Sequence, residues 1–224
     1  MKWKIIFILV LIYNISINNI YYLTQKIYNE GGNFLLLNSS KTLPTTIITA
    51  NPKVLLIDNF FSNYDINLIL SLVKKFKRSK VNTILKDSYI SSDRTSSTSC
   101  LNSTISKLLT IYLKKKTTNF TGLNWTKCEN LQIVKYEPGE EFKIHHDYSI
   151  KNNRCYTFFV YLNDDYEGGK TYFPILNFSV TPKKGMAVFW KNVTDDNKID
   201  NRLIHAGMPV IKGTKYGCNF WVRC

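Results

Sequence analysis

The second half of this chain alternates short apolar stretches with Gly, Asn, Asp and Pro, and this pattern constrains the fold more than any other feature. Short apolar stretches separated by turn residues are typical of strands in antiparallel sheets. Because stretches with helical spacing come earlier in the chain, the sequence predicts an α+β domain with a β-sandwich or barrel core. The expected strands are 131–136, 155–162, 170–173, 186–190, 203–205, 208–211 and 216–223.

Two helices are expected before this strand-rich half. An apolar, strand-like stretch over 54–61 leads to Ser62 and Asp65, which have the spacing of a capping box at a helix start. A second helix is expected to begin near 102–104 and to end at the lysines of 114–116. In the first helix, the apolar residues at helical spacing are Ile66, Ile69, Leu70 and Val73.

Residues 1–25 have the pattern of a membrane-targeting segment. Lys2 and Lys4 provide a positive start, and the unbroken apolar run over 5–13 has the length of a signal-peptide core. That run is shorter than the roughly 20 residues needed to span a bilayer, but apolar sequence continues to Leu23. Because no clear cleavage motif is present, a cleaved signal and a retained signal-anchor both stay open. Either one predicts delivery to the endoplasmic reticulum or secretory lumen. The anchor further predicts a single-pass type II protein held in the membrane by this segment.

The remaining chain divides into a linker and one domain. Residues 26–50 contain Gly31-Gly32 and Pro44 and are interpreted as a linker or stalk. Residues 51–224 have a suitable length for a domain with one hydrophobic core.

Sequons and cysteines agree with a luminal protein, although an Asn-rich chain generates sequons by chance. No cysteine pair has the Cys-x-x-Cys spacing of a zinc ribbon, and an oxidising lumen permits disulfides. A pair between Cys218 and Cys224, at i and i+6 of one strand, is one possibility among several. The other cysteines are Cys100, Cys128 and Cys155. The sequons, which predict a glycoprotein, are Asn38, Asn102, Asn119, Asn124, Asn177 and Asn192.

The chain is strongly basic, with 30 Lys and Arg against 16 Asp and Glu and a formal net charge of +14. A basic surface attracts nucleic acid, anionic lipid or acidic peptide. Lys, Asn and Ile are abundant throughout, however, so we interpret the charge mainly as a compositional bias. The lysines within 74–80 and 114–116 are expected on solvated helix faces, and no nucleic-acid partner is expected.

Three potential metal ligands occur at two places in the strand-rich half. His145 and Asp147 lie two residues apart, a spacing that puts both on one face of a strand and leaves His146 a structural role. His205, in a short strand before a Gly/Pro turn, is expected to arrive from across a barrel. Two imidazoles and one carboxylate form the facial triad of non-haem Fe(II) oxygenases. Lys215, shortly after His205, supplies a cation for a dicarboxylate cosubstrate.

With these residues, the chain resembles the prolyl 4-hydroxylases of the 2-oxoglutarate/Fe(II)-dependent dioxygenase superfamily over roughly residues 54–224. The resemblance implies a double-stranded β-helix, a jelly-roll core with flanking N-terminal helices. The matching blocks are Arg94-Thr-Ser-Ser, Glu129-Asn-Leu-Gln-Ile-Val-Lys-Tyr136-Glu-Pro-Gly139, Phe142-x-x-His145-His-Asp147-Tyr, Arg154-x-x-Thr157-Phe-Phe-Val-Tyr161-Leu-Asn, Glu167-Gly-Gly-Lys-Thr171-x-Phe-Pro174, Gly185-x-Ala-Val-Phe-Trp and His205-Ala-Gly-Met-Pro-Val-Ile-Lys-Gly-Thr-Lys215.

The resemblance also implies individual roles. The implied iron ligands are His145, Asp147 and His205. Lys215 and Thr171 would bind the far carboxylate of 2-oxoglutarate, and Tyr136 would line its pocket. The implied peptide-binding residues are Arg94, Glu129, Arg154 and Trp221. One departure is Phe142, where many relatives have a tyrosine, so the peptide contacts at that position are in doubt.

The implied activity is that of a procollagen-proline 4-dioxygenase-like oxidoreductase acting on Pro-rich or collagen-like polypeptides. It would consume O2 and 2-oxoglutarate, form 4-hydroxyproline, succinate and CO2, and use L-ascorbate to restore oxidised iron. One alternative is a dioxygenase of the same fold acting on lysine or nucleic acid, although such relatives usually carry arginine at the position of Lys215. The other is a non-catalytic peptide-binding barrel, against which the intact ligand set argues.

Overall fold

The structure, a computed structural model of the chain, describes residues 43–73, 75–81, 88–101 and 128–224. The expected targeting segment, most of the expected linker and the expected helix over 102–116 lie outside these residues. In the described part of the chain, no helix combines the length and the apolar sequence needed to cross a membrane.

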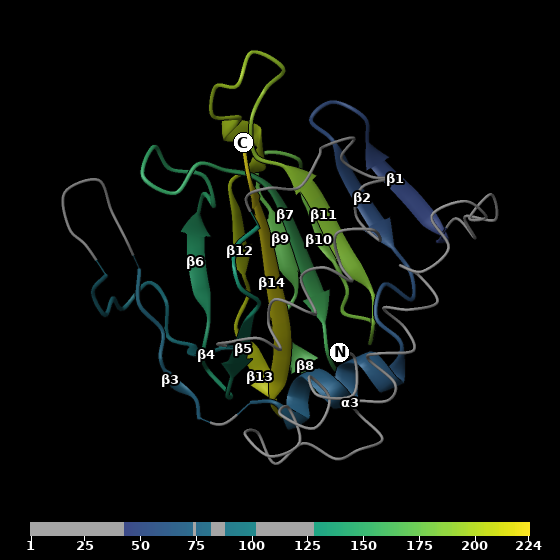
Figure 1. The fold of residues 1–224 in the computed structure, drawn as a ribbon, viewed down its shortest axis with the longest axis vertical. Coiled ribbons are helices and arrows are strands. Elements are labelled where there is room, and N and C mark those ends of the chain that lie inside the picture. The colour runs from purple at the N-terminus through teal and green to yellow at the C-terminus, as the bar shows by residue number, and fades with distance from the viewer. Residues whose placement is uncertain (1–42, 74, 82–87, 102–127) are drawn as a thin grey trace, which may run out of the picture. The chain divides into compact units, whose positions relative to one another are not determined.

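The described strands form one large sheet, one small sheet and a separate two-stranded pair (Figure 1). The large sheet has the order β1 (Thr45–Thr49), β2 (Val54–Ile57), β11 (Ala187–Lys191), β7 (Arg154–Tyr161), β14 (Lys215–Arg223), β5 (Gln132–Tyr136), β4 (Ser97–Cys100) and β3 (Lys77–Arg78). The small sheet has the order β10 (Phe178–Val180), β9 (Thr171–Phe173), β12 (His205–Gly207) and β6 (Phe142–His145). The pair consists of β8 (Glu167–Gly168) and β13 (Val210–Lys212).

One hydrophobic core joins residues of the large and the small sheet. Tyr161 and Trp190 of the large sheet belong to the same buried cluster as Phe173 and Val180 of the small sheet. Successive side chains of a strand point to opposite faces, so each sheet turns one face toward this core. Two sheets around a shared core agree with the expected jelly-roll, and the described part is mostly β-sheet.

The helix α3 (Asn63–Ser71) begins at the predicted capping box. The Ser62 hydroxyl accepts a hydrogen bond from the Asp65 backbone N–H at 3.2 Å, and the Asp65 carboxylate accepts one from the Ser62 N–H at 2.8 Å. Both bonds satisfy N–H groups that a helix start leaves unpaired. The segment before α3 packs on the large sheet. The ring of Phe60 stacks there on the ring of Phe158 in β7, with ring centroids 5.6 Å apart.

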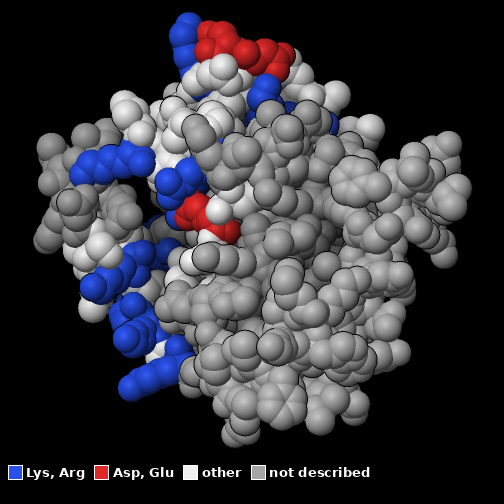
Figure 2. All heavy atoms as spheres, viewed as in Figure 1, with Lys and Arg blue, Asp and Glu red and all other residues white. Residues whose placement is uncertain are grey.

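Several elements differ from the sequence predictions. The helix α3 ends at Ser71, before Val73, and β4, β8 and β10 were not among the expected strands. Residues 45–49, expected in the linker, form β1 and pair with β2. The expected strand 203–205 begins only at His205, because the Asp200 carboxylate accepts from the Arg202 N–H and caps a 3-10 turn over Asn201–Leu203. Lys77, expected on a solvated helix face, lies on β3. Figure 2 shows Lys and Arg side chains gathered on the side of the molecule where β3 and β6 lie.

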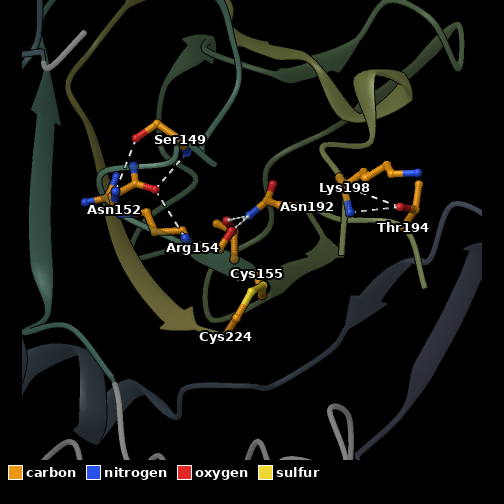
Figure 3. Close-up of a disulfide and its surroundings, with 9 residues drawn as sticks. Ser149, Asn152, Arg154, Cys155, Asn192, Thr194, Lys198 and Cys224 are labelled. Atoms are coloured by element: carbon orange, nitrogen blue, oxygen red, sulfur yellow. Dashed lines mark hydrogen bonds between the residues drawn. A yellow bond between two sulfur atoms is a disulfide. The ribbon is translucent and has the colours of Figure 1, made fainter. Parts of the chain in front are cut away.

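A disulfide joins Cys155 on β7 to Cys224 after β14 (Figure 3). Their Cα atoms lie 5.3 Å apart, because Arg154 and Arg223 are register partners in these neighbouring strands. The alternative pair of Cys218 with Cys224 is wrong. Six residues along an extended strand cover about 20 Å, far more than a disulfide bridges.

The two described sequons differ in accessibility. Asn177 is exposed in the turn between β9 and β10. Asn192 has an exposed fraction of 0% and is enclosed by its neighbours. A glycan on Asn192 is therefore incompatible with this fold, which corrects the expectation for that sequon.

Candidate active site

The three expected metal ligands come together at the pairing of β6 with β12. His145 and His205 are register partners in this antiparallel pair, and Asp147 lies two residues beyond the end of β6. The potential ligand atoms all lie within 4.8 Å of one another. The His145 Nε2 is 3.8 Å from the Asp147 Oδ1, and the His205 Nε2 is 3.9 Å from the Asp147 Oδ2. His205 thus arrives from the neighbouring strand, and not from across the barrel as expected.

The hydrogen bonds of both imidazoles leave the Nε2 atoms available for a metal. The His145 Nδ1 lies 2.7 Å from the Lys143 carbonyl, and the His205 Nδ1 lies 3.0 Å from the Leu203 carbonyl. Because a carbonyl only accepts, the proton resides on Nδ1 and the lone pair on Nε2, the usual arrangement of a metal-binding histidine. Burial, together with the neighbouring His205, lowers the pKa of His145 to about 3, and burial lowers the pKa of His205. Both rings are therefore neutral near pH 7. His146 points elsewhere, toward the Asp200 carbonyl at 3.1 Å.

Asp147 is oriented by two donors on the same oxygen. The Thr157 hydroxyl donates to Oδ2 at 2.7 Å, and the Trp221 indole N–H donates to Oδ2 at 3.1 Å. Burial raises the pKa of Asp147, but His205 and His145 outweigh burial and hold the pKa below its ordinary value. The carboxylate is thus ionised, with Oδ1 directed toward His145. Two neutral imidazoles and one carboxylate match the donor set of a ferrous facial triad.

A buried cation lies in the large sheet at Lys215, which is 2% exposed. Its ammonium donates to the Gly169 carbonyl at 2.7 Å and lies 5.0–5.5 Å from the ring centroids of Tyr136, Phe159 and Tyr161. No carboxylate of the described residues forms an ion pair with it, and burial lowers the pKa of Lys215 to about 7. An unpaired buried charge is unfavourable, so this position fits an anionic ligand.

Of the other expected cosubstrate residues, Tyr136 contacts this ammonium and Thr171 contacts Tyr161, which lies beside it. Tyr136 is the register partner of Lys215 on the neighbouring strand. The Thr171 hydroxyl is buried and lies 2.7 Å from the Tyr161 hydroxyl. Gly169 leaves space for the lysine, because a Cβ there would lie 3.0 Å from the Lys215 Cδ, and its φ of +60° favours glycine. A hydroxyl pair and an ammonium are the donors that a carboxylate requires.

Three of the four expected peptide-binding residues form one cluster. Arg154 donates two hydrogen bonds to the Glu129 carboxylate at 2.9 and 2.7 Å. Its guanidinium lies 3.5 Å from the centroid of the Trp221 ring. Trp221 is 4% exposed and donates to Asp147, so the cluster is attached to the metal-binding group.

Arg94 lies next to Phe142, whose ring stacks on His145. It is 7% exposed, donates to the Gln132 side-chain carbonyl at 2.9 Å and lies 4.8 Å from the Phe142 ring centroid. Its guanidinium is therefore engaged mainly with neighbours inside the protein.

Comparison with known proteins agrees with this geometry. Residues 131–223 match the family model of the 2OG-Fe(II) oxygenase superfamily. "Probable prolyl 4-hydroxylase 3" of Arabidopsis thaliana is 30% identical over 208 residues, covering 80% of this chain and 72% of the relative. The chain belongs to the prolyl 4-hydroxylase family.

Other relatives of this prolyl 4-hydroxylase family member match over shorter parts. "Prolyl 4-hydroxylase subunit alpha-1" of Homo sapiens is 35% identical over 116 residues, 47% of this chain. The match spans only 22% of that subunit, about a fifth of its length. Among solved structures, the viral collagen prolyl hydroxylase of Paramecium Bursaria Chlorella virus-1 has a TM-score of 0.62 at 24% identity, covering 76% of this chain and 96% of that one. This likeness establishes a shared fold.

Several residues of the hydroxylase site were not assigned a role from the sequence. Thr157 donates to Asp147, and Tyr161 contacts both Thr171 and Lys215. Thr157 and Tyr161 lie four residues apart on β7, and this even spacing, which puts both on one face of a strand, was the available signal. Asn192 donates a hydrogen bond to Thr157, and no local sequence pattern predicted a role for Asn192 at this site.

Proposed function

We propose that this chain is an Fe(II)- and 2-oxoglutarate-dependent dioxygenase that converts peptidyl-proline to 4-hydroxyproline. The observation that carries the proposal is the joint presence of the His145, Asp147 and His205 group and a buried Lys215 without a described carboxylate partner. The first fits a ferrous ion and the second fits the far carboxylate of 2-oxoglutarate. In the overall reaction, one oxygen atom of O2 enters the proline, the other enters succinate, and CO2 leaves.

Bound Fe(II) would supply the oxygen-activating redox chemistry, while the chain binds, orients and shields the reactants. Lys215 holds the cosubstrate carboxylate, with the Thr171 hydroxyl as an additional donor. Thr157 and Trp221 keep the Asp147 carboxylate in one orientation. Aromatic rings around Lys215 exclude water and strengthen its attraction for a carboxylate.

An extended Pro-rich or collagen-like peptide is the proposed substrate. Relatives named prolyl 4-hydroxylases support it, as does a similarly folded prolyl hydroxylase of Trichoplax adhaerens, described in complex with a hypoxia inducible factor peptide fragment. The partly exposed Arg154–Glu129 pair, which lies beside the buried Trp221, offers polar groups that could contact such a peptide.

The experiment is an assay of succinate formation with Fe(II), O2 and 2-oxoglutarate, with and without peptide. We expect poly-proline or Gly-x-Pro peptides to stimulate succinate release and to gain one oxygen atom at proline, as read by mass spectrometry. Stimulation by a lysine peptide or by alkylated nucleic acid instead would favour a related dioxygenase. Absence of any turnover would favour a non-catalytic barrel.

We further propose that the protein acts in the endoplasmic reticulum or secretory lumen and is attached to the membrane through residues 1–25. L-Ascorbate would restore oxidised iron during turnover. The Cys155–Cys224 disulfide suits an oxidising compartment, and the exposed Asn177 sequon suits glycosylation. Expression in eukaryotic cells, followed by membrane fractionation and glycosidase digestion, tests the location. A cytosolic, unglycosylated product would contradict it. Sustained turnover with ascorbate and rapid inactivation without it would support the ascorbate requirement.

A further inference from the structure

Asn192 lies at the centre of a buried hydrogen-bond network behind the metal-binding group. The Trp190 indole N–H donates to the Asn192 Oδ1 at 2.8 Å. The Asn192 Nδ2 donates to the Thr157 hydroxyl at 2.9 Å. It also donates to the Arg154 carbonyl at 3.0 Å (Figure 3). An indole N–H can only donate, so Trp190 determines which end of the amide is the oxygen. The other end then has to donate to Thr157.

The first branch of the network leads to Asp147. The Thr157 hydroxyl has a single proton, and it already accepts a hydrogen bond from Asn192. Its proton is therefore directed to the Asp147 Oδ2, 2.7 Å away. Without the amide donor, the hydroxyl is free to rotate and the carboxylate loses a fixed partner.

The second branch leads to His205. The Trp190 ring meets the His205 imidazole edge-on, with ring centroids 4.7 Å apart and planes at 65°. Because Asn192 holds the indole N–H, it also holds this ring against the imidazole. One buried amide thus acts on two of the three expected ligands.

Asn192 itself is anchored by its backbone. Its N–H donates to the Cys155 carbonyl at 2.7 Å, and its carbonyl accepts from the Asp200 N–H at 3.0 Å. With an exposed fraction of 0%, the side chain has no contact with bulk water. The amide is therefore a rigid support for its two polar partners.

We propose that Asn192 is a positioning residue that sets the metal affinity of the site through Thr157 and Trp190. This inference rests on the proposed function, since it concerns the same metal-binding group. It assigns a role inside the protein to Asn192, a sequon asparagine whose burial excludes glycosylation.

The test measures binding of Mn(II) alone, by electron paramagnetic resonance, in the full chain without 2-oxoglutarate or peptide. Asn192→Asp keeps the shape of the side chain and, when ionised, has no proton to donate to Thr157. Thr157→Val removes the hydroxyl with little change in shape. Because partners of metal ligands typically contribute 10–100-fold to metal affinity, we expect each variant to weaken Mn(II) binding by about that factor. We expect the double variant to be no weaker than the worse single variant, since both changes interrupt the same branch.

Matched variants separate positioning from general destabilisation. Asn163 is a partly buried asparagine whose side chain donates to the Thr214 carbonyl and accepts from the Tyr216 N–H, away from the three ligands. Asn163→Asp is expected to keep wild-type Mn(II) affinity. If Asn192→Asp fails to fold, the neutral Asn192→Ser is measured in its place. Wild-type affinity in the Asn192 variant, or additive losses with Thr157→Val, would overturn the inference. Failure of the wild-type chain to bind Mn(II) or Fe(II) would instead overturn the proposed function.

Discussion

The phenyl ring of Phe142 stacks on the imidazole of His145, with ring centroids 3.5 Å apart and planes 12° from parallel. The Arg94 guanidinium lies 4.8 Å from the centroid of the same phenyl ring. Phe142 therefore directly contacts His145, one of the three proposed metal ligands. A tyrosine at this position in relatives provides the same ring face, so the change to phenylalanine preserves the stacking surface.

Replacing this ring is expected to loosen His145. Aromatic pairs contribute about 0.5–1.5 kcal/mol beyond simple burial, which corresponds to roughly a twofold to twelvefold effect. We expect Phe142→Leu to weaken anaerobic Fe(II) binding by roughly that factor and Phe142→Tyr to retain wild-type affinity. Isothermal titration of the three proteins checks this. Equal affinities of the leucine variant and the wild type would show that the stacking has no effect on the site.

Lys215→Met is expected to have opposite effects on ligand binding and on stability. Removing one partner of a buried ion pair costs about 3–5 kcal/mol, so the 2-oxoglutarate requirement should rise by hundreds-fold or more. The free protein should become more stable, because the variant removes a buried charge that has no described carboxylate partner. Steady-state kinetics and urea unfolding measure the two effects. An unchanged 2-oxoglutarate requirement would remove Lys215 from the site.

Binding of 2-oxoglutarate is expected to depend on pH through the same residue. Burial lowers the pKa of Lys215 to about 7, and a carboxylate beside the ammonium would raise it. Above pH 7 the free protein must therefore take up a proton to bind the cosubstrate, so affinity should fall as pH rises from about 7 to about 9. Titration calorimetry in buffers of different ionisation enthalpy measures this uptake. Affinity that stays constant over this range would contradict the assignment, and Lys215→Met should lack the dependence.

The disulfide is expected to stabilise the fold. Cys155 and Cys224 are 69 residues apart, and closing a loop of this size typically contributes about 2–4 kcal/mol. Cys155→Ser with Cys224→Ser should lower the free energy of unfolding in urea by about that amount. Cys100→Ser, at an exposed free cysteine, serves as the control and should change it little. Equal stability of the double variant and the wild type would show that the disulfide does not restrain the chain.

Local patterns in the sequence predicted local structure well. The spacing of Ser62 and Asp65 predicted the start of α3, because a capping box involves only residues within one helical turn. Most strands of the second half also follow their apolar patterns. The prediction was wrong at 203–204, where the Asp200 side chain favours a 3-10 turn, and it missed the short strands β8 and β10. His145, Asp147 and His205 were selected together by their chemistry and by the family resemblance, although the neighbouring-strand origin of His205 was not foreseen.

Features that depend on contacts between distant segments could not be predicted in this way. The pairing of Cys155 with Cys224 follows from the register of β7 and β14, which no local pattern encodes. The buried amide of Asn192 appears in the sequence only as part of a sequon. Its contacts to Thr157 and Trp190 exist because β7 and β11 are neighbours in the large sheet.

The most direct test of this account is anaerobic Fe(II) binding by the wild-type chain and by His145→Ala, Asp147→Ala and His205→Ala. We expect the wild type to bind one ferrous ion and each variant to lose that binding while keeping its fold by circular dichroism. Retention of wild-type Fe(II) affinity by any of the three folded variants would contradict the assignment of the site.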